Sequence, residues 1–385
     1  MMACTAGFDR NHRRRKPFEE RHHLFASQLR AQNRCVHGIH PVKLENVLRR
    51  IHPNSANLVH GRSPLSEIIQ HDLILAHIDA VGGRPHQQIG NDDFTWFGTR
   101  ASKSRLNFLD LLRAGHIDYT INQAALDYMR ERALAAHVIA RLNEHPERCF
   151  ADRNAWNAHL ETLGISSLTV NPDPVTIATE GALWGSVKAH GFLPDTVIVS
   201  DDAGQFNVGQ HGLCWVHSER LVHKLDAFTD ENRAAQATLR ELIWKFYRDL
   251  KVYRLAPTKQ RKATLRARFD RIFTRKTGFV TLDRLLARLN ANKPELLRVL
   301  DRPEIPLHTN GSENDIRCQV TRRKVSAGTR SDIGRDCRDA FLGLAKTCAK
   351  LEIAFWDYLG DRLAVPGTQA IPPLSKIILA RARAP

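Results

Sequence analysis

Residues 196–206 read TVIVSDDAGQF, and this stretch decides the expected fold class. The run from Thr196 to Ser200 is short and continuously apolar, as is typical of a strand buried in a sheet. It delivers Asp201 and Asp202 at its carboxyl end, and a turn in the pattern D-x-x-G-x-F follows, with Phe206 as its last residue. We therefore expect an α/β fold with acidic side chains at a strand end.

The flanking sequence predicts further strands and helices. Strands are expected at 73–83 and 87–97, the second interrupted by NDD at 91–93, and a short strand at 119–121. Helical spacing of apolar residues is found at 106–112, 124–142, 180–190, 239–250, 265–273, 282–289, from about 312, and at 335–351. Pro303 and Pro306 separate the last two helices from those before them.

Composition divides the chain into five segments. Residues 1–70 form a basic region with weak patterning, for which poor order is the simpler interpretation and a DNA-contacting arm the alternative. Residues 218–302 carry 21 Lys and Arg against 10 Asp and Glu and predict a basic, all-helical insertion. It interrupts a core whose first part is 71–217 and whose last part is 303–362, and 363–385 form a C-terminal tail.

Charge and cysteine content limit the classes of protein to consider. The 385 residues include 57 Lys and Arg against 41 Asp and Glu, a formal net charge of +16, which predicts an anionic partner, most commonly nucleic acid. The 7 cysteines are scattered and form no C-x-x-C pair, a pattern typical of a reduced, cytoplasmic protein. The longest apolar runs are far shorter than the roughly 20 residues of a membrane-spanning helix, so we expect no membrane partner.

Three acidic residues stand where a carboxylate needs a partner. Asp79 ends one apolar strand, Asp201 follows another, and Glu313 opens a helix in HTNGSENDIR at 308–317. A buried carboxylate is costly unless it is paired, so each of these acids needs a cation, a hydrogen-bond network or a metal. Each acid taken alone is most simply a helix cap or a turn residue. Three that converge would hold two Mg²⁺ ions roughly 3.5–4 Å apart at a phosphodiester.

Basic residues accompany the last acid. Arg317 follows Glu313 by four positions, which places both on one helical face, and Arg322, Arg323 and Lys324 come next. Fixed cations beside a metal-binding acid suit a polyanionic substrate, whose flanking phosphates they would hold.

Cys214 and His217 have the spacing of two metal ligands. A tetrahedral zinc site needs four ligands, and no second pair is evident in the sequence. Structural support of the active site is therefore favoured over zinc.

The order of these motifs resembles the DDE transposases of bacterial insertion sequences, in particular the sixty-six family and its relatives. The segments that carry the resemblance are IVSDDAGQF (198–206), GLCWVHSERLVHKL (212–225), the helical insertion, NGSENDIR (310–317) and RRKVSAGTRSD (322–332). The resemblance covers 175–362 strongly and 72–112 weakly.

The resemblance implies a fold, an activity and a site. The fold is a ribonuclease-H-like mixed sheet flanked by helices, with the all-α insertion before the last catalytic helix. The catalytic and metal-binding triad is Asp79, Asp201 and Glu313, with Asp201 preferred over Asp202 because Phe206 follows it by five positions. The activity is cleavage and strand transfer at element ends with two Mg²⁺ or Mn²⁺ ions. The DNA-binding residues are Arg317, Arg322, Arg323 and Lys324, and the active protein is a homo-oligomer on DNA.

Two departures from the family pattern keep alternatives open. Asp79 precedes AVGGR (80–84) rather than a T-G-A-R-like turn, and no DNA-binding motif is recognisable in 1–70. A catalytically impaired, truncated DNA-binding remnant is one alternative. A nuclease of the same fold that does not transfer strands is another, and a zinc-dependent regulator is a distant third.

Overall fold

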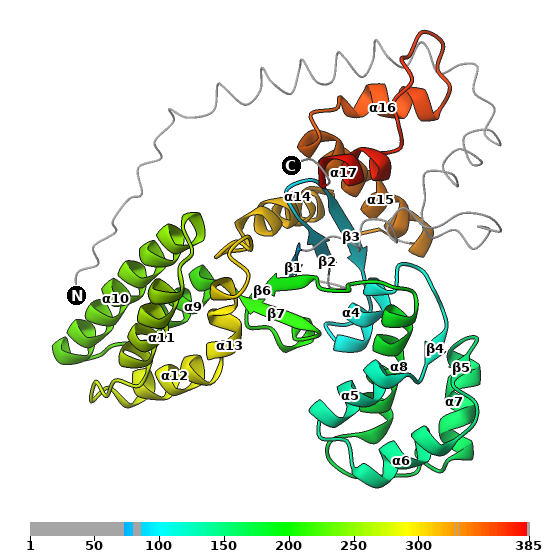
Figure 1. The fold of residues 1–385 in the computed structure, drawn as a ribbon. Helices are drawn as coiled ribbons and strands as arrows, with labels where there is room; N and C mark the ends of the chain where they lie inside the picture. The colour runs from blue at the N-terminus through cyan, green and yellow to red at the C-terminus, as the bar shows by residue number, and fades with distance from the viewer. Residues whose placement is uncertain (1–72, 80–85, 327, 330, 383–385) are drawn as a thin grey trace, which may run out of the picture. The chain divides into compact units, whose positions relative to one another are not determined.

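A five-stranded mixed sheet with helices on both faces organises the computed structural model (Figure 1). The structure describes residues 73–79, 86–326, 328, 329 and 331–382, all within one unit of the chain, 52–385. The expected α/β class is confirmed, whereas the expectations for 1–70 and for the turn after Asp79 lie outside the described residues. None of the described helices is both long and apolar enough to cross a membrane.

The sheet combines an antiparallel and a parallel half. Its strands in spatial order are β3 (Thr95–Thr99), β2 (His86–Gly90), β1 (Leu73–Asp79), β6 (Val197–Ser200) and β7 (Gln210–Leu213). The pairs β3–β2 and β2–β1 are antiparallel, while β1–β6 and β6–β7 are parallel, with Leu75 opposite Val199 and Ser200 opposite Leu213. The carboxyl ends of β1, β6 and β7 consequently lie at one edge of the sheet.

The single strand expected at 87–97 is wrong, because β2 and β3 are two arms of a hairpin. The side chain of Asn91 accepts hydrogen bonds from the backbone amides of Asp93 (2.8 Å) and Phe94 (3.1 Å). This local capture of backbone donors by an asparagine turns the chain where continued alternation would have extended it. The NDD interruption in the sequence is this turn.

Alternate residues of β6 belong to different cores. Ile198 packs with Phe108 of helix α4 (Arg105–Leu112) and Val187 of helix α8 (Pro174–Ala189) on one face of the sheet. Val197 and Val199 join the core of the insertion instead, because successive side chains of a strand point to opposite faces. This double burial explains why the strand reads as one continuous apolar run.

The segment between β3 and β6 is helical apart from a small two-stranded sheet. Its elements are α4 (Arg105–Leu112), β4 (Tyr119–Thr120), α5 (Gln123–Glu131), α6 (Ala136–Glu144), β5 (Cys149–Phe150), α7 (Arg153–Thr162) and α8 (Pro174–Ala189). The single helix expected over 124–142 is wrong, since Ala133 adopts a φ of 57° and divides it into α5 and α6. The short strand at 119–121 is confirmed as β4. Helix α8 begins earlier than expected, at the Asp173 cap.

The remaining helical elements are a 3₁₀ turn between β6 and β7, the helices in and around the insertion, and those of the C-terminal part. They are the 3₁₀ turn η1 (Gly204–Phe206), α9 (Trp215–His223), α10 (Asp230–Leu255), α11 (Lys259–Phe273), α12 (Val280–Ala291), α13 (Lys293–Leu296), the 3₁₀ turn η2 (Arg298–Leu300), α14 (Asn310–Ser326), α15 (Asp332–Lys350), α16 (Phe355–Arg362) and α17 (Leu374–Ala382). Trp215, Phe246 and Phe269 are buried together where α9, α10 and α11 meet. The helices at 239–250, 265–273 and 282–289 are thus confirmed, and the exact domain limits stay a prediction.

Candidate active site

Asp201 lies immediately after β6, at the carboxyl edge of the sheet. Its Oδ1 accepts a hydrogen bond from the amide of Ala203 (3.2 Å). The hydroxyl of the preceding residue, Ser200, lies 2.8 Å from Nε2 of His211. Burial lowers the pKa of His211 to about 4, so this imidazole is neutral at physiological pH. The strand end that carries Asp201 is therefore held by a neutral, buried hydrogen bond.

The turn after Asp201 is fixed by contacts that the sequence did not suggest. The guanidinium of Arg105 donates to the carbonyl oxygen of Gly204 at 2.6 Å and forms an ion pair with Glu180 at 3.2 Å. Glu180, buried in α8, also accepts a hydrogen bond from the hydroxyl of Tyr128 at 2.8 Å. The ring of Phe206 packs edge-on against Phe108, with centroids 4.9 Å apart. Two residues of α4, Arg105 and Phe108, thus hold the turn at Gly204 and Phe206.

Asp202 has a different environment from its neighbour. It forms an ion pair with Arg288 of α12 and accepts a hydrogen bond from Nδ2 of Asn292 at 3.2 Å. These contacts attach the insertion to the end of β6. The carboxylate of Asp202 is consequently engaged by the protein itself.

Cys214 and His217 connect the end of β6 to helix α14. The amide of Cys214 donates to the carbonyl oxygen of Ser200 at 2.8 Å. The thiol is buried, which raises the pKa of Cys214 and keeps it protonated. One helical turn later, Nε2 of His217 lies 3.2 Å from Oε1 of Glu313. These contacts link the end of β6 to α14, and the supporting role expected for both residues stays a prediction.

Glu313 is buried in the first turn of α14. Its amide donates to the carbonyl oxygen of Thr309 at 3.0 Å, and its other carboxylate oxygen lies 3.4 Å from the guanidinium of Arg317. The Arg317 side chain is 68% exposed, so it is free to move away when another cation approaches. Glu313 is thus oriented by His217 and only loosely held by the arginine.

Helix α14 is fixed to the sheet through two buried aspartates. Asp315 accepts hydrogen bonds from the hydroxyl of Thr95 at 2.6 Å and from the ammonium group of Lys350 at 2.7 Å. Asp339 of α15 bonds the amide of Thr99 at 2.7 Å and the side chain of Gln319 at 2.9 Å. Charge-assisted hydrogen bonds of this kind are the stronger ones in proteins, so they set the position of Glu313.

Asp79 ends β1, the strand that lies between β2 and β6 in the sheet. Strand β1 is parallel to β6, and α14 packs against β1 and β2. The backbone of Asp79 therefore lies at the same edge as Asp201, on the strand that α14 covers. The structure does not describe its side chain.

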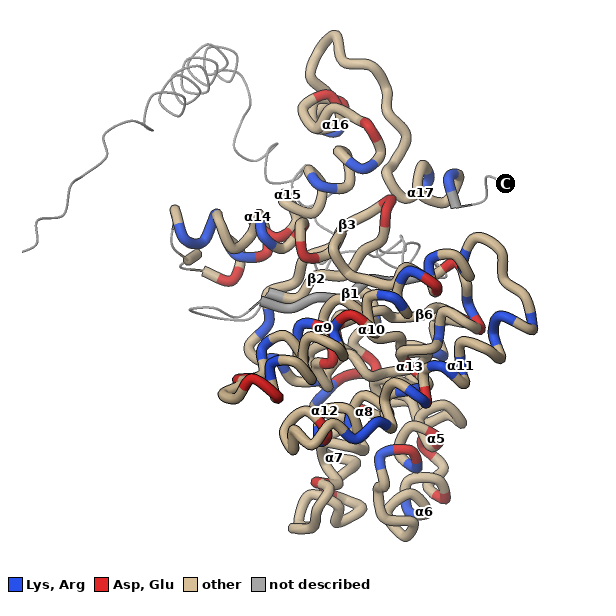
Figure 2. Tube along the Cα trace, turned by 90° about the vertical axis from the view of Figure 1, so that its left-hand side faces the viewer, with Lys and Arg blue, Asp and Glu red and all other residues tan. Residues whose placement is uncertain are grey.

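The predicted DNA-binding residues lie along α14. Arg317, Arg322 and Lys324 are exposed, whereas Arg323 is half-buried. Figure 2 shows further Lys and Arg residues along the helices of the insertion, α10 and α11. The exposed cations begin one helical turn beyond Glu313 and continue to the end of α14.

The donor groups suit a hard divalent cation. Asp201 and Glu313 offer carboxylate oxygens, the ligands that Mg²⁺ prefers. The single hydrogen bond of the Asp201 carboxylate within the described residues leaves most of its acceptor capacity available.

The sequence pointed to these acids, but it gave no signal for Arg105, Glu180, Asp315 or Asp339. Their partners are remote in sequence, so only an inventory of buried charges would have found them.

Comparison with known proteins identifies the chain. The model of the family described as "Transposase IS66 family" matches residues 191–336, a range that contains Asp201, Cys214, His217, Glu313 and the basic residues of α14, but not Asp79. "Uncharacterized protein y4jO" of Sinorhizobium fredii (strain NBRC 101917 / NGR234) is 50% identical over 295 residues, which cover 77% of this chain and 91% of the relative. No solved structure matches the chain.

The matched range includes the carboxyl end of β6 and the acidic and basic residues of α14. The class of protein that this match indicates is a transposase. The chain belongs to the IS66 family of transposases.

Proposed function

We propose that the chain is a DDE transposase that cleaves DNA at the ends of an insertion sequence and joins the freed end to a target. Asp79, Asp201 and Glu313 are its catalytic carboxylates. The sheet, with antiparallel β3, β2 and β1 beside parallel β6 and β7, has the mixed character expected of a ribonuclease-H-like core. The all-α insertion precedes α14, as that proposal requires.

One observation carries the proposal: a continuous series of contacts connects Asp201 to Glu313. Ser200, which precedes Asp201, accepts a hydrogen bond from Cys214 at 2.8 Å. His217, on the helix that Cys214 caps, lies 3.2 Å from Glu313. This series of contacts supports the proposal that the two acids, which are more than a hundred residues apart in sequence, act at one site.

The described side chains have distinct roles in this reaction. Arg105 and His211 keep the Asp201 turn in place, and His217 orients the carboxylate of Glu313. The exposed Arg317 and Arg322 would bind phosphates on either side of the cleaved bond, because a guanidinium donates two parallel hydrogen bonds to a phosphate. Most of the rate then comes from positioning and from charge neutralisation rather than from a covalent intermediate.

Two Mg²⁺ or Mn²⁺ ions, bound by the three carboxylates, would supply activation of the attacking oxygen and stabilisation of the leaving oxygen. The residues themselves determine where the phosphodiester lies and which oxygen is presented to it. A homo-oligomer on paired DNA ends is part of the same proposal.

The experiment is Mg²⁺-dependent cleavage of a duplex taken from the end of the element that encodes the chain. We expect Glu313→Gln to reduce cleavage by about 10³-fold, because it removes a metal-binding charge and preserves size. Glu161→Gln, the same change at an exposed position of α7, is the matched control and should cleave normally. DNA binding, measured by gel shift, should be retained in both variants. Equal cleavage by Glu313→Gln and the wild type would remove Glu313 from the mechanism.

Strand transfer distinguishes a transposase from a nuclease of the same fold. Duplexes with pre-cut ends and a free 3′-hydroxyl are supplied with target DNA. Joined products are expected, and they should disappear with Glu313→Gln. Cleavage of intact ends without any joining of pre-cut ends would favour the nuclease.

A further inference from the structure

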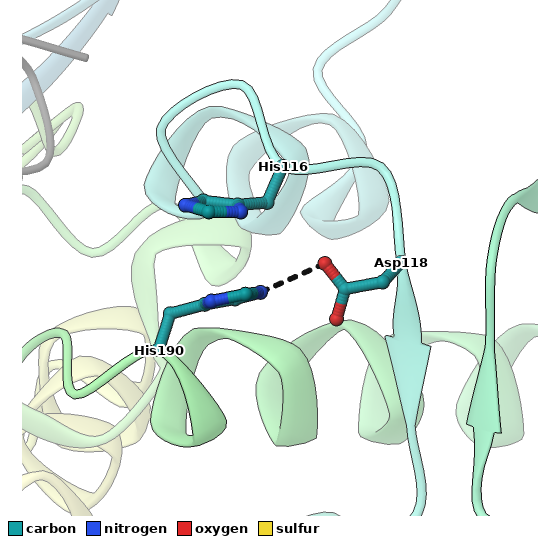
Figure 3. Close-up of side chains that lie close together, drawn as sticks. All are labelled: His116, Asp118 and His190. Carbon is teal, nitrogen blue, oxygen red and sulfur yellow. Dashed lines mark hydrogen bonds and ion pairs between the residues drawn. The ribbon is translucent and has the colours of Figure 1, made fainter. Parts of the chain in front are cut away.

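Three side chains with metal-binding chemistry converge in a part of the fold separate from the carboxylates of the proposed active site. His116 and Asp118 lie in the loop between α4 and β4, and His190 caps the carboxyl end of α8. One ligand atom from each lies within 4.8 Å of the others. Figure 3 shows the two imidazole rings stacked one above the other, with the carboxylate of Asp118 beside them. We propose that His116, Asp118 and His190 bind one divalent transition-metal ion, with Zn²⁺ as the probe that tests it.

The distances are close to those that one ion imposes. First-row divalent ions hold imidazole nitrogens and carboxylate oxygens at about 2.0–2.2 Å, so two ligands of one tetrahedral ion are about 3.3 Å apart. Nε2 of His190 lies 2.8 Å from Oδ1 of Asp118, and the ring centroids of His116 and His190 are 3.6 Å apart with planes at 21°. Binding would require the His116 ring to rotate out of this stack, because a coordinated ion lies in the plane of each imidazole ring.

The donor groups suit a divalent cation. The carboxylate of Asp118 and the imidazole rings of His116 and His190 are the three that come together here. When an ion binds, each imidazole would coordinate it through a ring nitrogen that carries no proton and would keep its proton on the other ring nitrogen.

The backbone that presents these residues is fixed on both sides. The amide of His116 donates to the carbonyl oxygen of Arg113, and that of His190 donates to the carbonyl oxygen of Ser186, at 3.0 and 3.1 Å. The buried ring of Phe192 packs against both imidazoles, with centroids 5.6 and 5.9 Å away. Such support limits the conformational entropy that binding costs. Two imidazoles and a carboxylate are the donor set of zinc sites that retain an open position for water.

A second group, His145, Glu147 and His159, has similar chemistry but a less suitable arrangement. Nδ1 of His145 already accepts a hydrogen bond from the amide of Glu147 at 3.2 Å. His159 is buried, and its ring lies 4.4 Å from the ring of Phe150. Because a ring nitrogen of His145 is already engaged and His159 is buried, this group supplies the control rather than the proposal.

The test is zinc binding by the full-length chain without DNA, measured by competition with a chromophoric chelator in excess Mg²⁺. Mg²⁺ occupies carboxylate-only sites but competes poorly for imidazole. The parent and all variants carry Glu313→Gln, which removes one active-site carboxylate as a competing ligand. We expect the parent chain to bind one equivalent of zinc. Its affinity for zinc should fall by at least about 100-fold in His116→Ala and should also fall in Asp118→Asn. His145→Ala, an identical change at another helix C-cap, should bind like the parent.

Two readouts make the outcome decisive. Thermal unfolding in the presence of chelator should be equal for His116→Ala and its parent, and zinc should raise the Tm of the parent only. Unchanged zinc affinity in both His116→Ala and Asp118→Asn, or the same loss in His145→Ala, would overturn the proposal. Because no DNA is present, this result is independent of whether the chain transposes.

Discussion

The end of β6 and the first turns of α14 each carry two neighbouring carboxylates, and in each region the two members of the pair have different environments. Asp202 is bound by Arg288 and Asn292, whereas its neighbour Asp201 accepts a single hydrogen bond from the residues that the structure describes, and it comes from its own turn. In α14, Asp315 accepts hydrogen bonds from Thr95 and Lys350, whereas Glu313 faces a histidine and an exposed arginine.

The comparison separates carboxylates that hold the fold from carboxylates available for chemistry. A carboxylate whose oxygens are already engaged by fixed cations cannot bind an ion without breaking those contacts. Asp202 attaches the insertion, and Asp315 attaches α14 to the sheet. Asp201 and Glu313 are therefore the acids whose loss should affect cleavage more than stability.

The largest expected effect is a contrast between Asp201→Asn and Asp202→Asn. Asp201→Asn should reduce Mg²⁺-dependent cleavage by about 10³-fold or more, because it removes a negative charge from the proposed metal-binding set. Asp202→Asn should retain cleavage within about tenfold, since an amide can still accept from Asn292 and only the ion pair with Arg288 is weakened. Single-turnover cleavage rates at saturating Mg²⁺ measure both.

The pair is its own control, because the two variants make the same chemical change at adjacent positions. Thermal unfolding curves should show a Tm close to the wild-type value for Asp201→Asn. If Asp202→Asn abolished cleavage and Asp201→Asn did not, the assignment of the acids at this strand end would be reversed.

Part of this arrangement could be predicted from sequence. The apolar run 196–200 identified the buried strand, whereas the preference for Asp201 over Asp202, which rests on the family resemblance, stays a prediction. The spacing of Glu313 and Arg317 correctly placed them on one helical face. These signals succeed because they depend on residues within one or two turns of each other.

The supporting contacts could not be predicted, for a physical reason. Asp315 depends on Thr95, and Asp339 on Thr99, partners that are more than two hundred positions away. Nothing local distinguishes a buried, bonded aspartate from a solvated one, and Asp339 reads as an ordinary helix-surface acid. The hairpin at 91–94 was missed because side-chain capture by Asn91 outweighed the strand pattern on either side of it.

A smaller effect is expected on stability within α14. Asp315→Ala should lower the free energy of unfolding by about 4 kcal/mol, because it leaves Lys350 and Thr95 without their buried partner. Glu313→Gln should change it by less than about 1 kcal/mol, since the exposed Arg317 regains water. Urea titration at neutral pH measures both values. A loss for Glu313→Gln as large as that for Asp315→Ala would show that the two acids do not differ in the way proposed.

The smallest effect concerns His211, the neutral histidine that contacts Ser200 next to Asp201. Because the pKa of His211 is about 4 in the folded chain and 6.5 in the reference state, the unfolded chain binds the proton more readily. The stabilisation is complete above pH 6.5 and is lost as the pH falls toward 4, by at most about 3 kcal/mol. His211→Asn removes this titration and leaves the other acids and histidines in place, so the difference in unfolding free energy between the variant and the wild type should narrow as the pH falls from 7 to 4.5. Parallel pH profiles for the two proteins would mean that His211 takes up its proton over the same pH range in the folded and the unfolded chain, so burial would not be what keeps the hydrogen bond between His211 and Ser200 neutral.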